Sequence, residues 1–393
     1  MKPGLHFWAA FLGAVLLTGA RASTLQISPG PGAAPASPPP PSPGARSRVV
    51  LVERPSAVNH FTLNPAAVVQ MWREGFLRLT GQKTEADGWR SLGVTANDVV
   101  GIKIAAHGND LVTPPPFLVD AMARGLIAAG VLPGHIIVWD RDGPNLAPTA
   151  YAVRDVTRPY LVRNVVPDTG FDANAFYVNE ITGKLIWGDL NFRGKTRDDL
   201  LRQADMAGGG AVGDDFSDGT PKGIVQQELA DQTSNRSYFA KILTQTCTKI
   251  VNVAVMIDDE SVGLGGCLSS LALGSVDNNR RFLADGVNGD PAIAEILDRD
   301  LFRKKTVLHV TEGLIAQYAG GPSCAPEFTR SPGALYLSAD PVAIDSLVLP
   351  RLEAWRQQAQ VVPIGNLARH VKGADAQGLG TSDPARIDLI KIP

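Results

Sequence analysis

The chain has 393 residues, and its 37 Lys and Arg side chains nearly balance its 39 Asp and Glu side chains, giving a formal net charge of −2. This balance, without a basic stripe, excludes a nucleic-acid-binding protein. Beyond residue 22 no apolar run is long enough to cross a bilayer, so no stable membrane span is expected after that point. The classes that remain are those of globular proteins.

The first 22 residues have the features of a secretory signal peptide. Lys2 precedes a mostly apolar stretch at 5–17, and Ala20-Arg21-Ala22 supplies a small-residue cleavage pattern. The apolar stretch is too short, and wrongly flanked, for a stable span, although a retained N-terminal anchor is the alternative. We therefore expect a Sec-type signal that is cleaved near Ala22, and a secreted or periplasmic protein.

A linker is expected to follow this signal. Residues 23–48 are dominated by Pro, Ala, Gly and Ser, and such a segment forms an extended, semi-rigid spacer because it has too few apolar side chains for a core. The folded part should then extend from residue 49 to residue 393. That length suits one large α/β domain or two smaller ones.

Three cysteines, Cys247, Cys267 and Cys324, bear on redox chemistry. In an oxidising compartment they allow one disulfide and one free thiol, and the sequence does not choose the pair. No C-x-x-C pattern occurs, so neither an iron–sulfur motif nor a zinc ribbon is predicted. Cys247 is either a nucleophile with a base nearby or, as is commoner, a buried core thiol.

Short β-rich runs alternate with helical patterns through the folded part. The predicted strands are 49–53, 99–105, 135–140, 250–257, 306–310, 333–337 and 387–392, and the predicted helices are 65–79, 117–129, 264–273 and 341–357. Most strands are continuous apolar runs, which is typical of strands that are covered on both faces. The alternation predicts an α/β fold with a mainly parallel sheet and helices on both faces. Pro350 should kink or split the last helix.

The region 151–235 departs from this alternation. Residues 176–188 have the pattern of a hairpin that turns at Thr182-Gly183. The stretch 207–221, rich in Gly and Asp, has the composition of a long loop. We interpret 151–235 as an insertion or cap on the α/β core.

Polar side chains follow five of the predicted strands. Open α/β sheets bind ligands at the carboxyl edge of their strands, so side chains at these strand ends are candidates for one pocket if the strands are neighbours. A small-molecule ligand is the partner that such a pocket predicts. The five residues are His107, Asp140, Asp258, Glu312 and Asp340.

Acid–base and metal chemistry are the first two hypotheses for these residues. His107, Asp140 and Asp258 are the candidate catalytic residues, because imidazole and paired carboxylates transfer protons. Asp140, Asp258 and Glu312 are the candidate ligands of a divalent cation, because hard cations prefer oxygen ligands.

Ligand binding is the third hypothesis, and four residues carry it. Lys103, Asn252, Arg280 and Asp340 are the candidate binding residues. Lys103 and Arg280 would hold an anionic part of the ligand. Two structural alternatives stay open, because Asp340 precedes Pro341 as an N-cap would, and Arg280 suits a surface salt bridge equally well.

Several motifs, in order, resemble those of the domain of unknown function 362 family. They are V-G-I-K-I at 100–104, I-I-V-W-D-R at 136–141, T-C-T-K-I-V-N-V at 246–253, G-S-V-D-N-N-R-R-F at 274–282, Q-Y-A-G-G-P at 317–322 and S-A-D-P-V-A-I-D at 338–345. The resemblance extends from about residue 49 to the C-terminus. It implies an uncharacterised α/β domain, which in some relatives stands beside iron–sulfur ferredoxin modules, and it brings no established reaction.

The chain departs from the family's pattern at its most polar motif. Relatives carry N-V-P-V-L-K-D-H and then T-G-A-L-K-N-L, and their two Lys and one His fall on Ile257, Ser269 and Asp259 here. The loss of these three basic side chains, together with the gain of Asp259 and Glu260, inverts the local charge. The acids are either the edge of a remodelled site that prefers a cation or a cationic ligand, or the remnant of a site whose chemistry has lapsed.

Three function hypotheses follow from the sequence. The leading one is a secreted or periplasmic α/β protein that binds a small ligand at the carboxyl edge of its sheet, as an enzyme that depends on a divalent cation or on its carboxylates. The alternative is a non-catalytic binding or interaction protein that has lost the family's active site. The third, a redox-associated protein, rests only on the ferredoxin-linked relatives.

Overall fold

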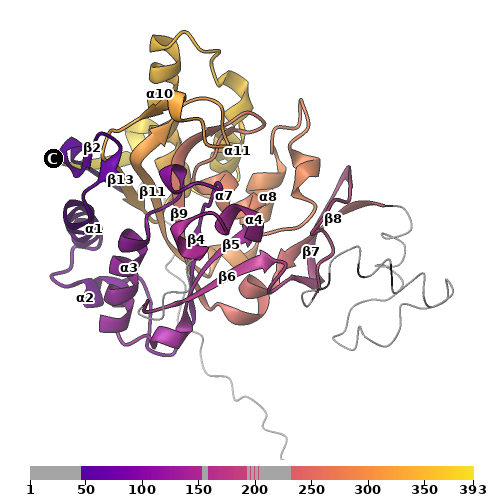
Figure 1. Ribbon diagram of the computed structural model, residues 1–393, viewed down its shortest axis with the longest axis horizontal. Coiled ribbons are helices and arrows are strands. Elements are labelled where there is room, and N and C mark those ends of the chain that lie inside the picture. The colour runs from indigo at the N-terminus through magenta and orange to yellow at the C-terminus, as the bar shows by residue number, and fades with distance from the viewer. Residues whose placement is uncertain (1–45, 153–157, 193–194, 196–198, 200–201, 203–231) are drawn as a thin grey trace, which may run out of the picture. The chain divides into compact units, whose positions relative to one another are not determined.

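The computed structural model describes residues 46–152, 158–192, 195, 199, 202 and 232–393, which lie within one unit, 37–393 (Figure 1). The predicted signal peptide, nearly all of the predicted linker and the loop at 207–221 lie outside the described residues. In the part of the chain that is described, no helix is long and apolar enough to span a membrane.

A large mixed sheet forms the centre of the fold. Its strand order is β14-β1-β13-β11-β9-β4-β5-β6, and β13 is antiparallel to both of its neighbours, whereas the other strands of this order point the same way. The prediction of an α/β fold with a mainly parallel sheet is confirmed. The strands are β1 Ser47–Glu53, β4 Val100–Ile104, β5 Ile136–Asp142, β6 Leu161–Val166, β9 Lys249–Asp259, β11 Thr306–Gln317, β13 Ala334–Ser338 and β14 Ile387–Ile392.

Six shorter or separate strands accompany this sheet. β10 pairs with β9, and β12 pairs with β11, so both extend the main sheet. β2 pairs with β3, and β7 pairs with β8 in a separate two-stranded ribbon. Their bounds are β2 Val58–Asn59, β3 Thr62–Leu63, β7 Phe171–Lys184, β8 Thr233–Ala240, β10 Gly263–Leu264 and β12 Thr329–Arg330.

Helices cover both faces of the sheet because its strands are apolar on both sides. In β1, Val50 and Val52 face the core that includes α1, α2 and α3, whereas Val49 and Leu51 face the core that includes α7, α8, α10 and α11 (Figure 1). The helices are α1 Pro65–Thr80, α2 Glu85–Ser91, α3 Pro116–Ala128, α4 Gly143–Leu146, α7 Cys267–Leu273, α8 Ala292–Leu297, α9 Asp300–Arg303, α10 Pro341–Gln358 and α11 His370–Ala376.

Two of these helices start as the sequence predicts. The Asn64 side chain accepts a hydrogen bond from the Ala67 N–H at 3.3 Å, and Pro65 occupies the first helical position of α1. The sequence predicts a kink or a split at Pro350, and the split is wrong, because α10 runs without interruption past this residue. Pro350 lies on the exposed side of α10, where the carbonyl group that loses its partner can bond to water.

The interpretation of 151–235 as one insertion needs correction. β6 belongs to this region and is an edge strand of the main sheet. The predicted hairpin at 176–188 is also wrong, since Gly183 pairs with Ser234 of β8 and does not turn the chain. Gly183 is required for packing, because a Cβ there would lie 2.5 Å from Arg281 Cβ and 2.8 Å from Asn278 Oδ1.

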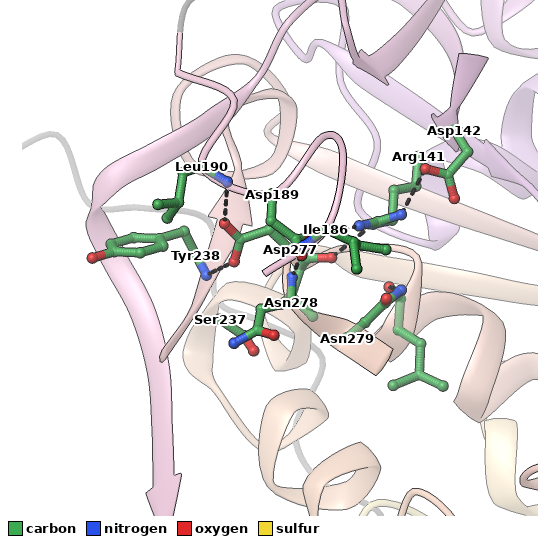
Figure 2. Close-up of polar contacts among 12 residues, drawn as sticks. Arg141, Asp142, Ile186, Asp189, Leu190, Ser237, Tyr238, Asp277, Asn278 and Asn279 are labelled. Carbon is green, nitrogen blue, oxygen red and sulfur yellow. Dashed lines mark hydrogen bonds and ion pairs between the residues drawn. The ribbon is translucent and has the colours of Figure 1, made fainter. Parts of the chain in front are cut away.

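Buried ionic contacts join the β7–β8 ribbon to the main sheet (Figure 2). Arg141 of β5 pairs with Asp189, in the loop after β7, at 3.4 Å. Asp189 accepts a hydrogen bond from the Asn278 N–H at 2.7 Å, and Asp277 accepts one from the Tyr238 N–H of β8 at 2.6 Å. The D-N-N-R-R-F segment therefore works as a junction between ribbon and sheet.

The antiparallel direction of β13 moves Asp340 away from the predicted pocket. Ser338, at the end of β13, lies beside Val49 and His309 in the amino-terminal halves of β1 and β11, so Asp340 lies at the opposite edge from the other candidates. There Asp340 accepts hydrogen bonds from the Ala343 N–H and the Thr381 N–H, both at 2.9 Å, and from the Ser47 hydroxyl. Asp340 is the N-cap of α10.

Replacing Asp340 should therefore reduce stability. We expect Asp340→Ala to lower the free energy of unfolding by about 1–3 kcal/mol, because it leaves buried N–H groups without partners. Urea unfolding followed by circular dichroism measures this. The control is Asp383→Ala, which removes the exposed cap of the Ala385 N–H and should change stability by less than about 1 kcal/mol. Equal small effects for both variants would contradict the assignment.

Candidate functional site

The chain leaves β4 and β9 toward opposite faces of the sheet. These two strands are adjacent and parallel. α3 follows β4 and packs into one core, whereas α7 follows β9 and packs into the other core. A position where two adjacent parallel strands are followed by connections to opposite faces is a topological switch point. Open α/β sheets bind ligands there, just beyond the carboxyl ends of the strands. The candidate site therefore lies at the ends of β4, β9 and the neighbouring β5.

A buried ammonium group lies at this point. Lys103 in β4 is 3% exposed, and its Nζ lies 3.1 Å from Asp140 Oδ1 in β5 and 3.0 Å from the Ser270 Oγ of α7, to which it donates. Asp140 also accepts a hydrogen bond from the Ala106 N–H at 3.2 Å. Burial raises the pKa of the Asp140 carboxyl, and the charge of Lys103 opposes this effect.

His107 lies in the loop that follows β4, near this ion pair. Burial and the charge of Lys103 lower the pKa of His107 to about 4, so the imidazole is neutral at pH 7. In the described part of the chain its Nε2 atom has no hydrogen-bond partner, although it is buried. A neutral imidazole of this kind can accept or donate one hydrogen bond to a ligand.

Asn252 and His309 continue a polar row beneath α7. Asn252 of β9 lies beside Lys103 on one side and His309 of β11 on the other. Its Nδ2 donates to the Cys267 carbonyl at 3.0 Å and to His309 Nδ1 at 3.2 Å. Its Oδ1 has no partner among the described residues. Burial lowers the pKa of His309 to about 3, so this ring is neutral as well.

Asp258 and Asp259, the two acids that end β9, have structural partners, whereas Glu260 follows the strand. Asp258 Oδ1 accepts the Gly321 N–H at 3.0 Å, and Asp258 Oδ2 pairs with Arg356 at 3.2 Å. Asp259 Oδ1 caps the following turn by accepting two backbone N–H groups at 2.8 and 3.0 Å. Glu260 is exposed. The cluster thus anchors the 318–325 loop and a turn.

In the described part of the chain, neither Glu312 nor Arg280 forms a hydrogen bond or ion pair with the Lys103 ammonium. Glu312 is 2% exposed, and its one hydrogen bond among the described residues is from the Leu314 N–H at 3.0 Å. Burial raises its pKa to about 8. Arg280 is exposed, whereas its neighbour Arg281 is buried and donates to the Ser237 Oγ at 3.0 Å.

Metal ligation gains no support from this geometry. Within the described ranges, no three His, Cys, Asp or Glu side chains lie close enough together to hold a metal ion. Asp140, Asp258 and Glu312, the predicted ligands, each have different partners, namely Lys103, Arg356 and a backbone N–H. A divalent cation therefore stays a prediction from the sequence alone.

All three cysteines are free thiols. Cys247 and Cys267 are buried, and Cys324 is half-buried. Burial raises the pKa of Cys247 to about 12, which suits a core thiol and not a nucleophile. The disulfide that the sequence allowed is not formed.

The glycine-rich turn before α7 is occupied by a carboxylate from α10. Asp345 accepts the N–H groups of Cys267 and Leu268 at 2.8 and 2.9 Å. A Cβ on Gly266 would lie 2.3 Å from Asp345 Oδ1, so glycine is needed for this contact. The start of α7 therefore has an internal anionic partner.

An open groove lies elsewhere, beside the C-terminal half of α10. Its volume is about 900 Å³, and its lining is mostly apolar and includes Val361, Val362 and Pro363. Its one charged side chain, Glu353, accepts the Gly365 N–H at 2.8 Å. This groove contains no group suited to chemistry.

Sequence reasoning missed Ser270 and His309. Ser270 occupies a position where the resembling family carries Asn, and a helix that follows β9 at a division of the chain is expected to lie over β4. His309 is the single polar ring in the apolar run of β11. The position of Ser270 over β4 and the position of His309 beside Asn252 follow only once the strand order is known. Lys103, Asp140 and Asn252 are brought together as predicted, with His107 beside them.

Comparisons with known proteins add little to this geometry. No protein-family model matches the chain, and no curated protein matches it. A crystal structure of a Thermotoga maritima protein from the Northeast Structural Genomics Consortium is similar at 11% sequence identity, with a TM-score of 0.34. The match covers 76% of this chain and 60% of that one. The resemblance to the domain of unknown function 362 family stays a prediction.

The buried Glu312 carboxyl predicts a stability that depends on pH. Its pKa rises from 4.5 to about 8 on folding, so the folded state binds the proton more tightly, and stability is lost as pH rises through this range. We expect Glu312→Gln to match the wild type near pH 4 and to be more stable by about 2–4 kcal/mol at pH 8. Urea unfolding across this pH range measures the difference. Parallel stability curves would contradict the assignment.

Proposed function

We propose that the protein binds a small polar organic ligand at the carboxyl ends of β4, β5 and β9. The observation that carries this proposal is the buried Lys103 ammonium at the topological switch point between β4 and β9. Asp140 and Ser270 hold this ammonium in place. A buried charge is expensive to maintain, and burial raises the pKa of the Asp140 carboxyl beside it, as is common for groups at functional sites. We also propose, from residues 1–22 alone, that the protein is exported.

Hydrogen bonding, more than net charge, would recognise this ligand. Lys103 and Asp140 neutralise each other, and His107 is neutral at pH 7. Two groups have no hydrogen-bond partner among the described residues, His107 Nε2 and Asn252 Oδ1, and both are neutral. These features favour a neutral, oxygen-bearing molecule over a strongly charged one.

A non-catalytic binding protein is the second candidate. Asp258 supports it, because this residue, predicted to be catalytic, is held by Arg356 and Gly321. The two candidates share the binding site and differ in whether bonds are broken there. The redox alternative has no supporting contact in the described residues and would require cofactor absorption bands in the purified protein.

Ligand-dependent stabilisation tests the proposed site. We expect at least one member of a panel of small aldehydes, ketones, hydroxy acids and sugars to raise the thermal midpoint, because a ligand that binds only the folded state stabilises it. The shift should disappear in Lys103→Met/Asp140→Asn. This double variant removes both charges, so neither is left buried alone.

A second buried ion pair provides the matched control. Asp258→Asn/Arg356→Met also removes a buried pair, but one that lies outside the proposed site. It should lose stability and keep the ligand-induced shift. A shift that survives in Lys103→Met/Asp140→Asn would place the binding site elsewhere and contradict the proposal.

A further inference from the structure

The Lys103 amine lies between a carboxyl group and a hydroxyl group, which is an arrangement suited to a reactive amine. Asp140 Oδ1 at 3.1 Å and Ser270 Oγ at 3.0 Å take two of its three N–H positions, and the described residues offer no third acceptor. A carboxyl group that can carry a proton and a hydroxyl group thus flank a primary amine.

Gly274 leaves one side of this amine without a side chain. A Cβ at this position would lie 2.7 Å from Lys103 Cε and 2.9 Å from Nζ, and 2.4 Å from the Ser270 carbonyl oxygen. The φ of Gly274 is −74°, which any residue can adopt, so packing requires the glycine and the backbone conformation does not. Ser270 and Gly274 are half-buried, so the end of α7 that packs on this amine is itself partly exposed to solvent.

We propose that Lys103 forms an imine with a neutral aldehyde or ketone bound at this site. This inference rests on the proposed function and names its ligand class. Lysine amines in desolvated positions form imines with carbonyl compounds when an acid is at hand. Asp140 is that acid, and Ser270 hydrogen-bonds the amine.

The chemistry balances without any further reagent. One proton moves from Lys103 Nζ to Asp140 Oδ1, which leaves a neutral amine and a neutral carboxylic acid. The amine attacks the carbonyl carbon, and the carbinolamine oxygen takes the proton from Asp140 and a second from nitrogen as it leaves as water. The products are a protonated imine on Lys103 and the Asp140 carboxylate, so the site keeps its charge.

Charge conservation selects the neutral carbonyl class. Iminium and carboxylate replace ammonium and carboxylate, so a neutral ligand leaves the buried site balanced. A keto acid would add a negative charge, and the nearest predicted partner for it, Arg280, is exposed and makes no contact with Lys103. Burial raises the pKa of Asp140, which favours the neutral acid that the first step needs.

Lys305 is a matched internal control. It is half-buried, its Nζ donates to the Cys247 carbonyl at 2.7 Å and to the Leu243 carbonyl, and burial lowers its pKa. Its amine thus loses a proton more easily than that of an exposed lysine, but the described residues place no carboxylic acid beside it. A difference between the two lysines would report on Asp140.

Borohydride trapping tests the inference. The purified protein is treated with glycolaldehyde or hydroxyacetone and sodium borohydride, and the labelled fraction of each lysine is measured by peptide mass spectrometry. We expect Lys103 to be labelled at least tenfold more than Lys305 and the exposed Lys391. Asp140→Asn should lower the labelling of Lys103 at least tenfold, and pyruvate should label it less than the neutral probes.

The outcomes separate this inference from the proposed function. If a compound stabilises the wild type through Lys103 and Asp140 but no probe labels Lys103, the imine is overturned and the binding site stands. If no compound stabilises the protein and no probe labels Lys103, both are overturned. Labelling of Lys103 that equals that of Lys391 reflects ordinary amine reactivity and overturns the imine.

Discussion

The ion pair between Lys103 and Asp140 is the interaction on which the carboxyl edge of the sheet depends. It joins β4 to β5, the Ala106 N–H ties the following loop to the same carboxylate, and Ser270 brings α7 onto the same ammonium. Removing one member of a buried pair leaves the other charge unpaired, which lowers the free energy of unfolding by about 3–5 kcal/mol. Replacing a buried ion pair by apolar side chains is often neutral or stabilising in proteins, which is why we interpret this pair as a functional feature.

Other charged side chains near the sheet hold loops and the β7–β8 ribbon in place. Asp258 holds Gly321 and Arg356, and a Cβ on Gly321 would lie 2.0 Å from the Asp258 carbonyl oxygen. Arg141 and Asp277 fasten the ribbon. The Lys103–Asp140 pair is thus left without a further charged partner among the described residues, and this balance is the ground on which a neutral ligand is proposed.

Local patterns of the sequence predicted much of the fold. Continuous apolar runs gave the strands, and Asn64-Pro65 and Asp340-Pro341 gave two helix starts, because capping and burial are set by adjacent residues. Strand direction is different, since β13 has the same apolar pattern whether it is parallel or antiparallel. This is why Asp340 was assigned to the wrong edge.

The partners of buried charges were the part of the site that sequence could not supply. Arg356 lies 98 residues from Asp258, and Ser270 lies 167 residues from Lys103, so no spacing rule connects them. Glu312 looked like a metal ligand because a carboxylate at a strand end suits that role. Its burial without a countercharge follows only from the packing around it.

A double-mutant cycle on Lys103 and Asp140 tests the central claim most directly. The free energies of unfolding of Lys103→Met, Asp140→Asn, the double variant and the wild type give the coupling between the two side chains. We expect a coupling of about 2–4 kcal/mol, with the double variant more stable than Lys103→Met alone. A coupling below about 0.5 kcal/mol would show that the two groups act independently and would contradict the account.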